Sequence, residues 1–169
     1  DLIGGGDPDT SPNYGGNLIG LGDGGPTGLT PNVRVVDVTI EGSGGFGVNL
    51  QARSTFSDDS AGLTIRGAGA LPSGSNIDTA YPLYIEGPAL TSIPVGSYTG
   101  NAKDEIFVAN ASSMQDTAVT IHERGVPYYF SDSFGMAPAA SAADGGLSIL
   151  TIEAGVTIRV SNGGASSTR

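Results

Sequence analysis

The sequence has no cysteine, no tryptophan and a single histidine, His122, among its 169 residues. Without cysteine there is neither a disulfide framework nor a thiolate metal site. No apolar run reaches the roughly 18 residues that a membrane-spanning helix needs, and no stretch of the sequence is expected to be a signal peptide. The chain begins at Asp1 without an initiator methionine, which predicts a mature or trimmed product.

Basic residues are also scarce, with 7 Lys and Arg against 17 Asp and Glu and a net charge of −10. Such a charge disfavours nucleic acid and anionic membrane surfaces as partners. It suits a soluble extracellular protein, or one that binds divalent cations. Glycine-rich stretches resemble phosphate-binding loops in composition alone, because no Lys-Ser/Thr pair follows them. Nucleotide binding is therefore excluded.

No window of a dozen residues keeps a helical period, whereas short alternating runs recur from Asn32 onward. In "FGVNLQAR", Phe46, Val48 and Leu50 fall on one face of a strand. Gly, Pro, Asn, Asp or Ser bounds each run, as is typical of strands joined by turns. The first predicted strand contains a one-residue slip that indicates a bulge. The predicted strands are 33–41, 46–53, 61–67, 81–87, 104–110, 117–123, 126–134, 150–153 and 156–160. The chain is predicted to be all-β.

A corner at Ala154-Gly155 separates the last two runs, in the sequence "LTIEAGVTIRV". Glycine permits a sharp bend from which the chain continues into another sheet, and this explains the corner better than a hairpin does. Two pairs of segments are also similar in sequence. The segment that begins at Leu63 resembles the one at Leu150, and the segment that begins at Tyr81 resembles the one at Val126. These features favour a short solenoid-like stack of strands, with a β-sandwich as the alternative.

Residues 97–160 carry a family resemblance. "SYTGNAKDEIFV" and "GVPYYF…GGLSILTIEAGVTIRV" are similar to segments of right-handed parallel β-helix proteins of bacterial cell surfaces. Those proteins repeatedly show a Gly-Val-Pro-Tyr strand, a loop, and a Leu-Thr-Ile-Glu strand pair turned at glycine. The resemblance implies a right-handed parallel β-helix on a bacterial surface. Its motifs are structural and imply no particular activity.

Residues 1–31 form a Gly/Asp/Pro-rich arm or linker ahead of an all-β domain at 32–169. Within the arm, "DLIGGGD" recurs as "NLIGLGD". Two interpretations stay open: a flexible tail, or two extended segments that add to a sheet edge of this or a neighbouring subunit. In the second, the apolar anchors for assembly are Leu2, Ile3, Leu18 and Ile19.

Candidate catalytic groups are few. His122 and Glu123 are sequence neighbours and would point to opposite faces of a strand, so His122 is assigned to a polar surface. A carbohydrate-active β-helix would use carboxylates and aromatic platforms on one sheet. The candidate carboxylates are Asp104, Glu105, Glu123 and Asp132, and the candidate platforms are Tyr81, Tyr84, Tyr98, Tyr128 and Tyr129. No motif pairs the carboxylates, so no catalytic residue is assigned.

Two acidic loops are weak candidates for Ca²⁺, which takes six to eight oxygen ligands. One contains Asp7 and Asp9, and the other contains Asp58 and Asp59. Neither matches an EF-hand or a Gly-Gly-x-Gly-x-Asp repeat, and aspartate in a loop usually caps a turn. No cofactor is otherwise expected.

The sequence therefore predicts an extracellular or cell-surface structural or adhesive module, bacterial in origin, that acts through sheet faces and edges. Self-assembly into a filament or surface layer through residues 1–31 is part of this hypothesis. Binding of an unidentified surface partner would serve the same role. The alternative is a β-helix that binds or cleaves carbohydrate.

Overall fold

The computed structural model describes residues 2–3, 16–21, 31–69, 80–111, 118–136 and 149–161. Strands dominate it, which confirms the all-β prediction. A six-residue 3₁₀-helix, η2 (Gly87–Ser92), begins with a proline in its first turn. Among the described residues, no helix has the length and hydropathy of a membrane span.

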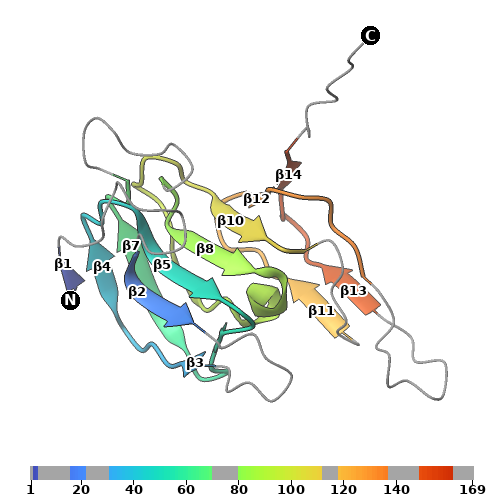
Figure 1. Ribbon diagram of the computed structural model, residues 1–169, viewed down its shortest axis with the longest axis horizontal. Coiled ribbons are helices and arrows are strands. Elements are labelled where there is room, and N and C mark those ends of the chain that lie inside the picture. Colours follow the sequence, from blue (N-terminus) through green and yellow to red (C-terminus); the bar gives the residue numbers. More distant parts are fainter. Residues whose placement is uncertain are drawn as a thin grey trace, which may run out of the picture.

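Every strand pair that the structure describes is parallel. The largest sheet, sheet B, has six strands in the order β14-β12-β10-β8-β5-β2 (Figure 1). Their bounds are β2 Gly16–Leu21, β5 Phe46–Gln51, β8 Leu83–Glu86, β10 Ile106–Ala109, β12 Tyr128–Phe130 and β14 Ile158–Val160.

A second, four-stranded sheet, sheet A, has the order β1-β4-β7-β9. Its strands are β1 Leu2–Ile3, β4 Thr39–Glu41, β7 Ala61–Arg66 and β9 Val95–Ser97. Two further pairs complete the described strands, β3 (Asn32–Val33) with β6 (Thr55–Phe56), and β11 (Ala118–Ile121) with β13 (Ile149–Ile152).

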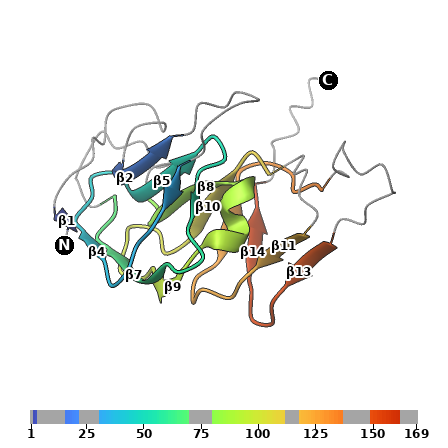
Figure 2. The same cartoon turned by 90° about the horizontal axis from the view of Figure 1, so that it is seen from below.

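Helix η2 links these two pairs through side-chain hydroxyls. The Phe56 backbone N–H donates to Ser92 Oγ over 3.0 Å, and the Thr120 N–H donates to Thr91 Oγ1 over 2.9 Å. Figure 2 shows the helix beside β11. β3, β6, η2, β11 and β13 therefore form a third row of elements, which we call row C.

Successive elements of the chain belong to row C, sheet A and sheet B, and this order repeats along the sequence. β3, β4 and β5 are followed by β6, β7 and β8, and these by η2, β9 and β10. In the last two turns, β11 leads to β12 and β13 leads to β14, and a short corner replaces the sheet A strand. Each turn stacks on the one before it, and we call each turn a rung.

The core consists of columns of apolar side chains that run from rung to rung. One column in sheet B contains Val48, Leu83, Ile106 and Tyr128, all fully buried and aligned by the parallel register. A second contains Leu50, Ile85, Val108 and Phe130. Because each rung covers the apolar face of the previous one, no single rung needs a core of its own.

The corner predicted at Ala154-Gly155 is confirmed. β13 lies in row C and β14 in sheet B, and Gly155 between them has φ +92°. Gly125 occupies the equivalent corner of the previous rung with φ +75°, since Tyr128 pairs with Ile158 at the same offset. "ERGV" and "EAGV" are thus the same corner in two successive rungs, and both need the left-handed backbone that glycine adopts readily.

The bulged strand predicted for residues 33–41 is wrong. β3 ends at Val33 in row C and β4 begins at Thr39 in sheet A, with Asp37 at φ +51° between them. The slip in alternation marks a corner between two sheets, because a change of sheet also reverses which residues point inward.

The two Leu-Ile segments of residues 1–31 both lie in strands that pair with this chain's own sheets. Leu2 pairs with Ile40 across β1 and β4, and Leu18 pairs with Val48 across β2 and β5. Leu18 packs against the core, and Ile19 is exposed. These segments therefore extend sheets A and B by one strand each, as in the second of the two interpretations.

The close approach of β9 to β7 provides a test of the stack. A Cβ added to Gly96 would lie 2.0 Å from the backbone oxygen of Leu63. We expect Gly96→Ala to lower the free energy of unfolding by about 1–3 kcal/mol, because this oxygen cannot move without disturbing the β7–β9 pairing. Val95→Ala, at the adjacent and 69% exposed position, should change it by less than about 0.5 kcal/mol. Urea denaturation measures both, and equal effects would contradict the close packing.

Candidate functional site

The outer face of sheet B carries a row of aligned side chains. The parallel register places Asn49, Tyr84, Phe107, Tyr129 and Arg159 in successive strands at the same position. Their neighbours along each strand point into the core, so these five point away from it. Three adjacent members are aromatic and only partly buried. We call these three, Tyr84, Phe107 and Tyr129, the aromatic row.

The rings of the aromatic row contact one another. The Tyr84 and Phe107 ring centroids lie 5.3 Å apart with planes 14° from parallel, and those of Phe107 and Tyr129 lie 5.6 Å apart at 47°. Two buried rings support the row from the side. Phe46 lies 5.1 Å from Tyr84, and Tyr81 lies 5.9 Å from Tyr129 in a stacked arrangement. Each ring of the row is therefore packed against other aromatic rings.

Lys103 fixes one of the supporting rings. Its Nζ donates a hydrogen bond of 2.9 Å to the Tyr81 hydroxyl and lies 4.6 Å from a Tyr81 ring centroid. Burial raises the pKa of Tyr81, and the nearby ammonium group of Lys103 opposes that rise. The lysine charge is thus used to orient an aromatic side chain.

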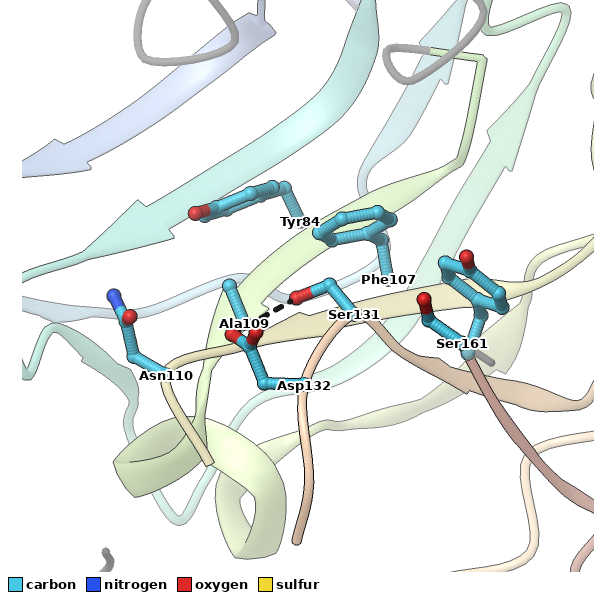
Figure 3. Close-up of a pocket in the computed structure, with 8 residues that line it drawn as sticks. Tyr84, Phe107, Ala109, Asn110, Ser131, Asp132 and Ser161 are labelled. Atoms are coloured by element: carbon cyan, nitrogen blue, oxygen red, sulfur yellow. Dashed lines mark hydrogen bonds between the residues drawn. The ribbon is translucent and has the colours of Figure 1, made fainter. Parts of the chain in front are cut away.

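A groove of about 380 Å³ runs along the aromatic row. Its lining residues are Tyr84, Phe107, Ala109, Asn110, Tyr129, Ser131, Asp132 and Ser161. Figure 3 shows Tyr84 and Phe107 along one side and the polar side chains of Asn110, Ser131, Asp132 and Ser161 along the other. An apolar ring surface thus faces a set of hydrogen-bonding groups.

The ends of β10 and β12 supply these polar groups. Asn110 follows β10 with φ +51°, a left-handed conformation that asparagine tolerates better than most residues. Its Nδ2 donates to Glu86 Oε1 over 2.9 Å, and Glu86 Oε2 accepts from the Ala52 N–H over 2.7 Å. Ser131 and Asp132 follow β12, and the Ser131 hydroxyl donates to Asp132 Oδ2 over 3.4 Å. The polar side of the groove is held in place by backbone turns.

The phenol of Tyr84 stays protonated at neutral pH. Burial raises its pKa, and the negative charges of Glu86 and Asp132 raise it further. Tyr84 is therefore a hydrogen-bond donor beside the groove, and it is unsuited to act as a base.

Of the four candidate carboxylates, Asp132 alone lines the groove among the described residues. Asp104 accepts a 2.7 Å hydrogen bond from the Asn101 N–H in a turn, and Glu105 pairs with Arg159. Glu123 accepts from the Gly125 N–H at a corner. The fold does not assemble them into one constellation.

The predicted tyrosine platforms divide into two groups. Tyr84 and Tyr129 line the groove, and Tyr81 supports it from a buried position. Tyr98 and Tyr128 are buried in the core, where their hydroxyls donate to the backbone oxygens of Pro94 and His122. Phe107, in the middle of the row, escaped the sequence prediction because only tyrosines were considered there.

His122 lies at a corner between rungs. Its Nδ1 lies 2.7 Å from Glu153 Oε1, and the Glu123 N–H donates to Glu153 Oε2 over 2.8 Å. The hydrogen bond from the Glu123 backbone and the contact with His122 lower the pKa of Glu153. This pair is not visible in the sequence, because the two residues are 31 positions apart. The pairing of Ile121 with Ile152 brings them together.

Of the four Ca²⁺ candidates, the structure describes Asp58 and Asp59. Asp7 and Asp9 lie outside the described residues. Asp59 is bonded to Arg34 and Ser57, and the Arg34 hydrogen bond is the largest cause of its lowered pKa. Asp58 is exposed. Within the described ranges, no group of three or more His, Asp or Glu side chains is placed to hold a metal ion.

Comparison of the chain with protein-family models, with curated proteins and with solved structures gave no match.

Acid titration tests the role of Glu153. A carboxylate with a lowered pKa in the folded state contributes stability above its ordinary pKa of about 4.3, and this contribution is lost as pH falls through the folded-state value. We expect the melting temperature of the wild-type protein to fall as pH drops through this acidic range. Glu153→Gln should lower the melting temperature at pH 7 and show a smaller fall in acid. Calorimetry across this range measures both, and an identical acid-side fall in the variant would exclude the assigned role.

Proposed function

We propose that this protein is an adhesive module of a bacterial cell surface that binds neutral carbohydrate chains along the groove on sheet B. The observation that carries this proposal is the packed aromatic row, Tyr84, Phe107 and Tyr129, facing a polar side that contains Asp132. The extracellular setting rests on the resemblance of residues 97–160 to bacterial surface proteins.

The scaffold would be a short right-handed parallel β-helix. The repeated order of row C, sheet A and sheet B and the parallel register support this architecture over a β-sandwich, which is built from antiparallel sheets. A right-handed path is the expected one for parallel strands joined by crossover connections. In such a scaffold, side chains at one position in successive rungs form straight rows on the surface, a geometry that suits an extended polymer.

Sugar rings have apolar C–H faces and hydroxyl edges, and the groove offers a partner for each. The exposed ring surfaces of Phe107 and Tyr129 can pack against a sugar ring, and the Tyr84 hydroxyl, Asn110, Ser131 and Asp132 can form hydrogen bonds with its hydroxyls. Pockets for small ligands commonly combine a mostly apolar lining with a few placed polar groups. The groove volume of about 380 Å³ lies within the usual range for such sites.

The charges favour a neutral ligand over an anionic one. The net charge is −10, and the described residues that line the groove include Asp132 and no Lys or Arg. Arg159, next in the row after Tyr129, is paired with Glu105. An acidic polysaccharide or a nucleic acid would meet repulsion here.

Binding is favoured over cleavage. Glycoside hydrolysis by the usual mechanisms needs two carboxyl groups on either side of the scissile bond. Asp132 is the one carboxylate among the described lining residues, and Glu86 is engaged by Asn110 and the Ala52 N–H. The described part of the groove thus offers the groups of a binding site and a single acid.

Affinity electrophoresis with neutral and acidic polysaccharides tests the proposal. We expect at least one neutral polysaccharide, from a panel of β-glucans, xylan and galactomannan, to slow the protein in the gel. Tyr129→Ala should weaken this binding about tenfold, since loss of a stacking ring costs on the order of 1 kcal/mol or more. Tyr129→Phe, which keeps the ring, should retain most of the affinity.

A comparison of two Asp→Asn variants provides the matched control. Asp132→Asn changes a group in the groove and should alter the affinity or the ligand preference, whereas Asp58→Asn changes an exposed carboxylate outside the groove and should have no effect. If no neutral polysaccharide retards the protein, or if acidic ones bind better, the proposal fails.

A further inference from the structure

Glu86 connects three successive strands of sheet B beside the groove. It is the last residue of β8 and lies on the outer face of the sheet, two positions after Tyr84. Its Oε2 accepts a hydrogen bond of 2.7 Å from the Ala52 N–H, directly after β5, and its Oε1 accepts one of 2.9 Å from Asn110 Nδ2, directly after β10. One carboxylate therefore ties the ends of β5 and β10 to β8.

Both donors to Glu86 occupy corners with a left-handed backbone. Ala52 has φ +50° and Asn110 has φ +51°, and residues other than glycine adopt such values uncommonly. Hydrogen bonds to a carboxylate are stronger than those between neutral groups, so Glu86 stabilises both corners. The two donors differ in one respect. The Ala52 N–H belongs to the main chain and cannot turn away, whereas the Asn110 amide can rotate at the end of its side chain.

The Glu86 carboxylate decides which end of the Asn110 amide faces the groove. A carboxylate only accepts hydrogen bonds, so the Nδ2 group of Asn110, and not its Oδ1, must face Glu86. Asn110 lines the groove, and Glu86 is not among the described lining residues. The hydrogen bond therefore holds Nδ2 on the side of Glu86 and leaves Oδ1, an acceptor, for a ligand.

Asp132 adds a second acceptor on the polar side of the groove, where Figure 3 also shows Asn110. Its Oδ2 accepts from the Ser131 hydroxyl over 3.4 Å, and a carboxylate has further lone pairs that can accept from a ligand. Across the groove, burial and the negative charges of Glu86 and Asp132 raise the pKa of Tyr84, whose hydroxyl remains a donor. The Asn110 and Asp132 side of the groove thus suits a ligand that donates hydrogen bonds.

We propose that Glu86 is a positioning residue of the groove and that, through Asn110, it selects glycans with free hydroxyl groups over glycans whose hydroxyls are acylated. This inference rests on the proposed function. A free hydroxyl can donate to Asn110 Oδ1 and to Asp132, whereas the oxygens of an ester group can only accept. An acylated sugar would cover these two acceptors without satisfying them, and an unsatisfied polar group costs more free energy than an ordinary hydrogen bond contributes.

Glu86→Gln tests this role because it should reverse the Asn110 amide. The new amide has to keep its oxygen on the Ala52 N–H, so its NH₂ group faces Asn110. Two NH₂ groups cannot bond to each other, and Asn110 is expected to rotate and turn its own NH₂ group toward the groove. Affinity electrophoresis should show that the wild type prefers deacetylated over acetylated xylan and untreated over acetylated galactomannan. In the variant this ratio of affinities should fall about fivefold, as for the loss of one hydrogen bond.

A double variant provides the rescue. Glu86→Gln combined with Asn110→Asp exchanges the two groups, and the carboxylate at position 110 accepts from the new amide with one oxygen and presents the other to the groove. The preference should return to the wild-type ratio, and aspartate tolerates φ +51° as asparagine does. Glu41→Gln, which removes an ion pair with Arg66 on sheet A, is the matched control and should leave the preference unchanged.

Nuclear magnetic resonance of the free protein gives a readout without any glycan. One side-chain amide proton of Asn110 should resonate downfield in the wild type, because it bonds to a carboxylate, and Glu86→Gln should abolish this shift. The pKa of the Tyr84 phenol should be lower in the same variant, since the charge of Glu86 contributes to raising it. Tyr84→Phe assigns the phenol signal, and Glu41→Gln should change neither signal.

The outcomes separate this inference from the proposed function. Wild-type binding with an unchanged preference in Glu86→Gln overturns the inference and leaves the proposed function intact, and so does an Asn110 amide signal that this variant does not alter. A wild-type preference for the acetylated polysaccharides also overturns it, without the need for any variant. If no neutral polysaccharide binds the wild type, the proposed function fails and the inference fails with it.

Discussion

The strands that the structure describes have two to six residues, and a strand of that length has no stability alone. Each is stabilised because it pairs in parallel register with the strand one rung away and places its apolar side chains on those of the neighbour. The register is the constraint on which everything else depends. A slip of one residue in any rung would turn buried residues such as Ile85 outward and outer residues such as Tyr84 inward.

The same register also aligns the side chains on the outer face of sheet B. Because every strand of sheet B contributes one outward residue at the same height, residues far apart in sequence become neighbours in a straight row. Tyr84, Phe107 and Tyr129 make ring contacts for this reason, and His122 meets Glu153 for the same reason at a corner. The proposed binding groove is a consequence of this repetition, because it follows a row of outward side chains from one strand of sheet B to the next.

The chain passes from one sheet to the next at short corners, several of which contain a residue with positive φ. Gly125 and Gly155 adopt left-handed backbone conformations at equivalent corners, and the carboxylates of Glu123 and Glu153 accept backbone hydrogen bonds there. Elsewhere non-glycine residues take this role, with Asp37 at φ +51° and Asn110 at φ +51°. Short polar side chains such as these tolerate that conformation better than bulky ones. The corner chemistry is thus partly visible in sequence, as Gly, Asn or Asp at the end of an apolar run.

The sequence by itself determined the class of fold and the position of most strands, because alternation and glycine-bounded runs are local properties. It also located the Ala154-Gly155 corner and the repeated Leu-Ile segments of the arm, but only the structure showed that these segments pair with the sheets. It did not reveal that residues 33–41 divide between two sheets, that η2 replaces a strand, or which side chains share a row. Those features depend on the lengths of the connections, which vary from rung to rung and set the register between segments 20 or more positions apart. Only the tertiary structure decides that register, so only it could separate Tyr84 and Tyr129 in the groove from Tyr98 and Tyr128 in the core.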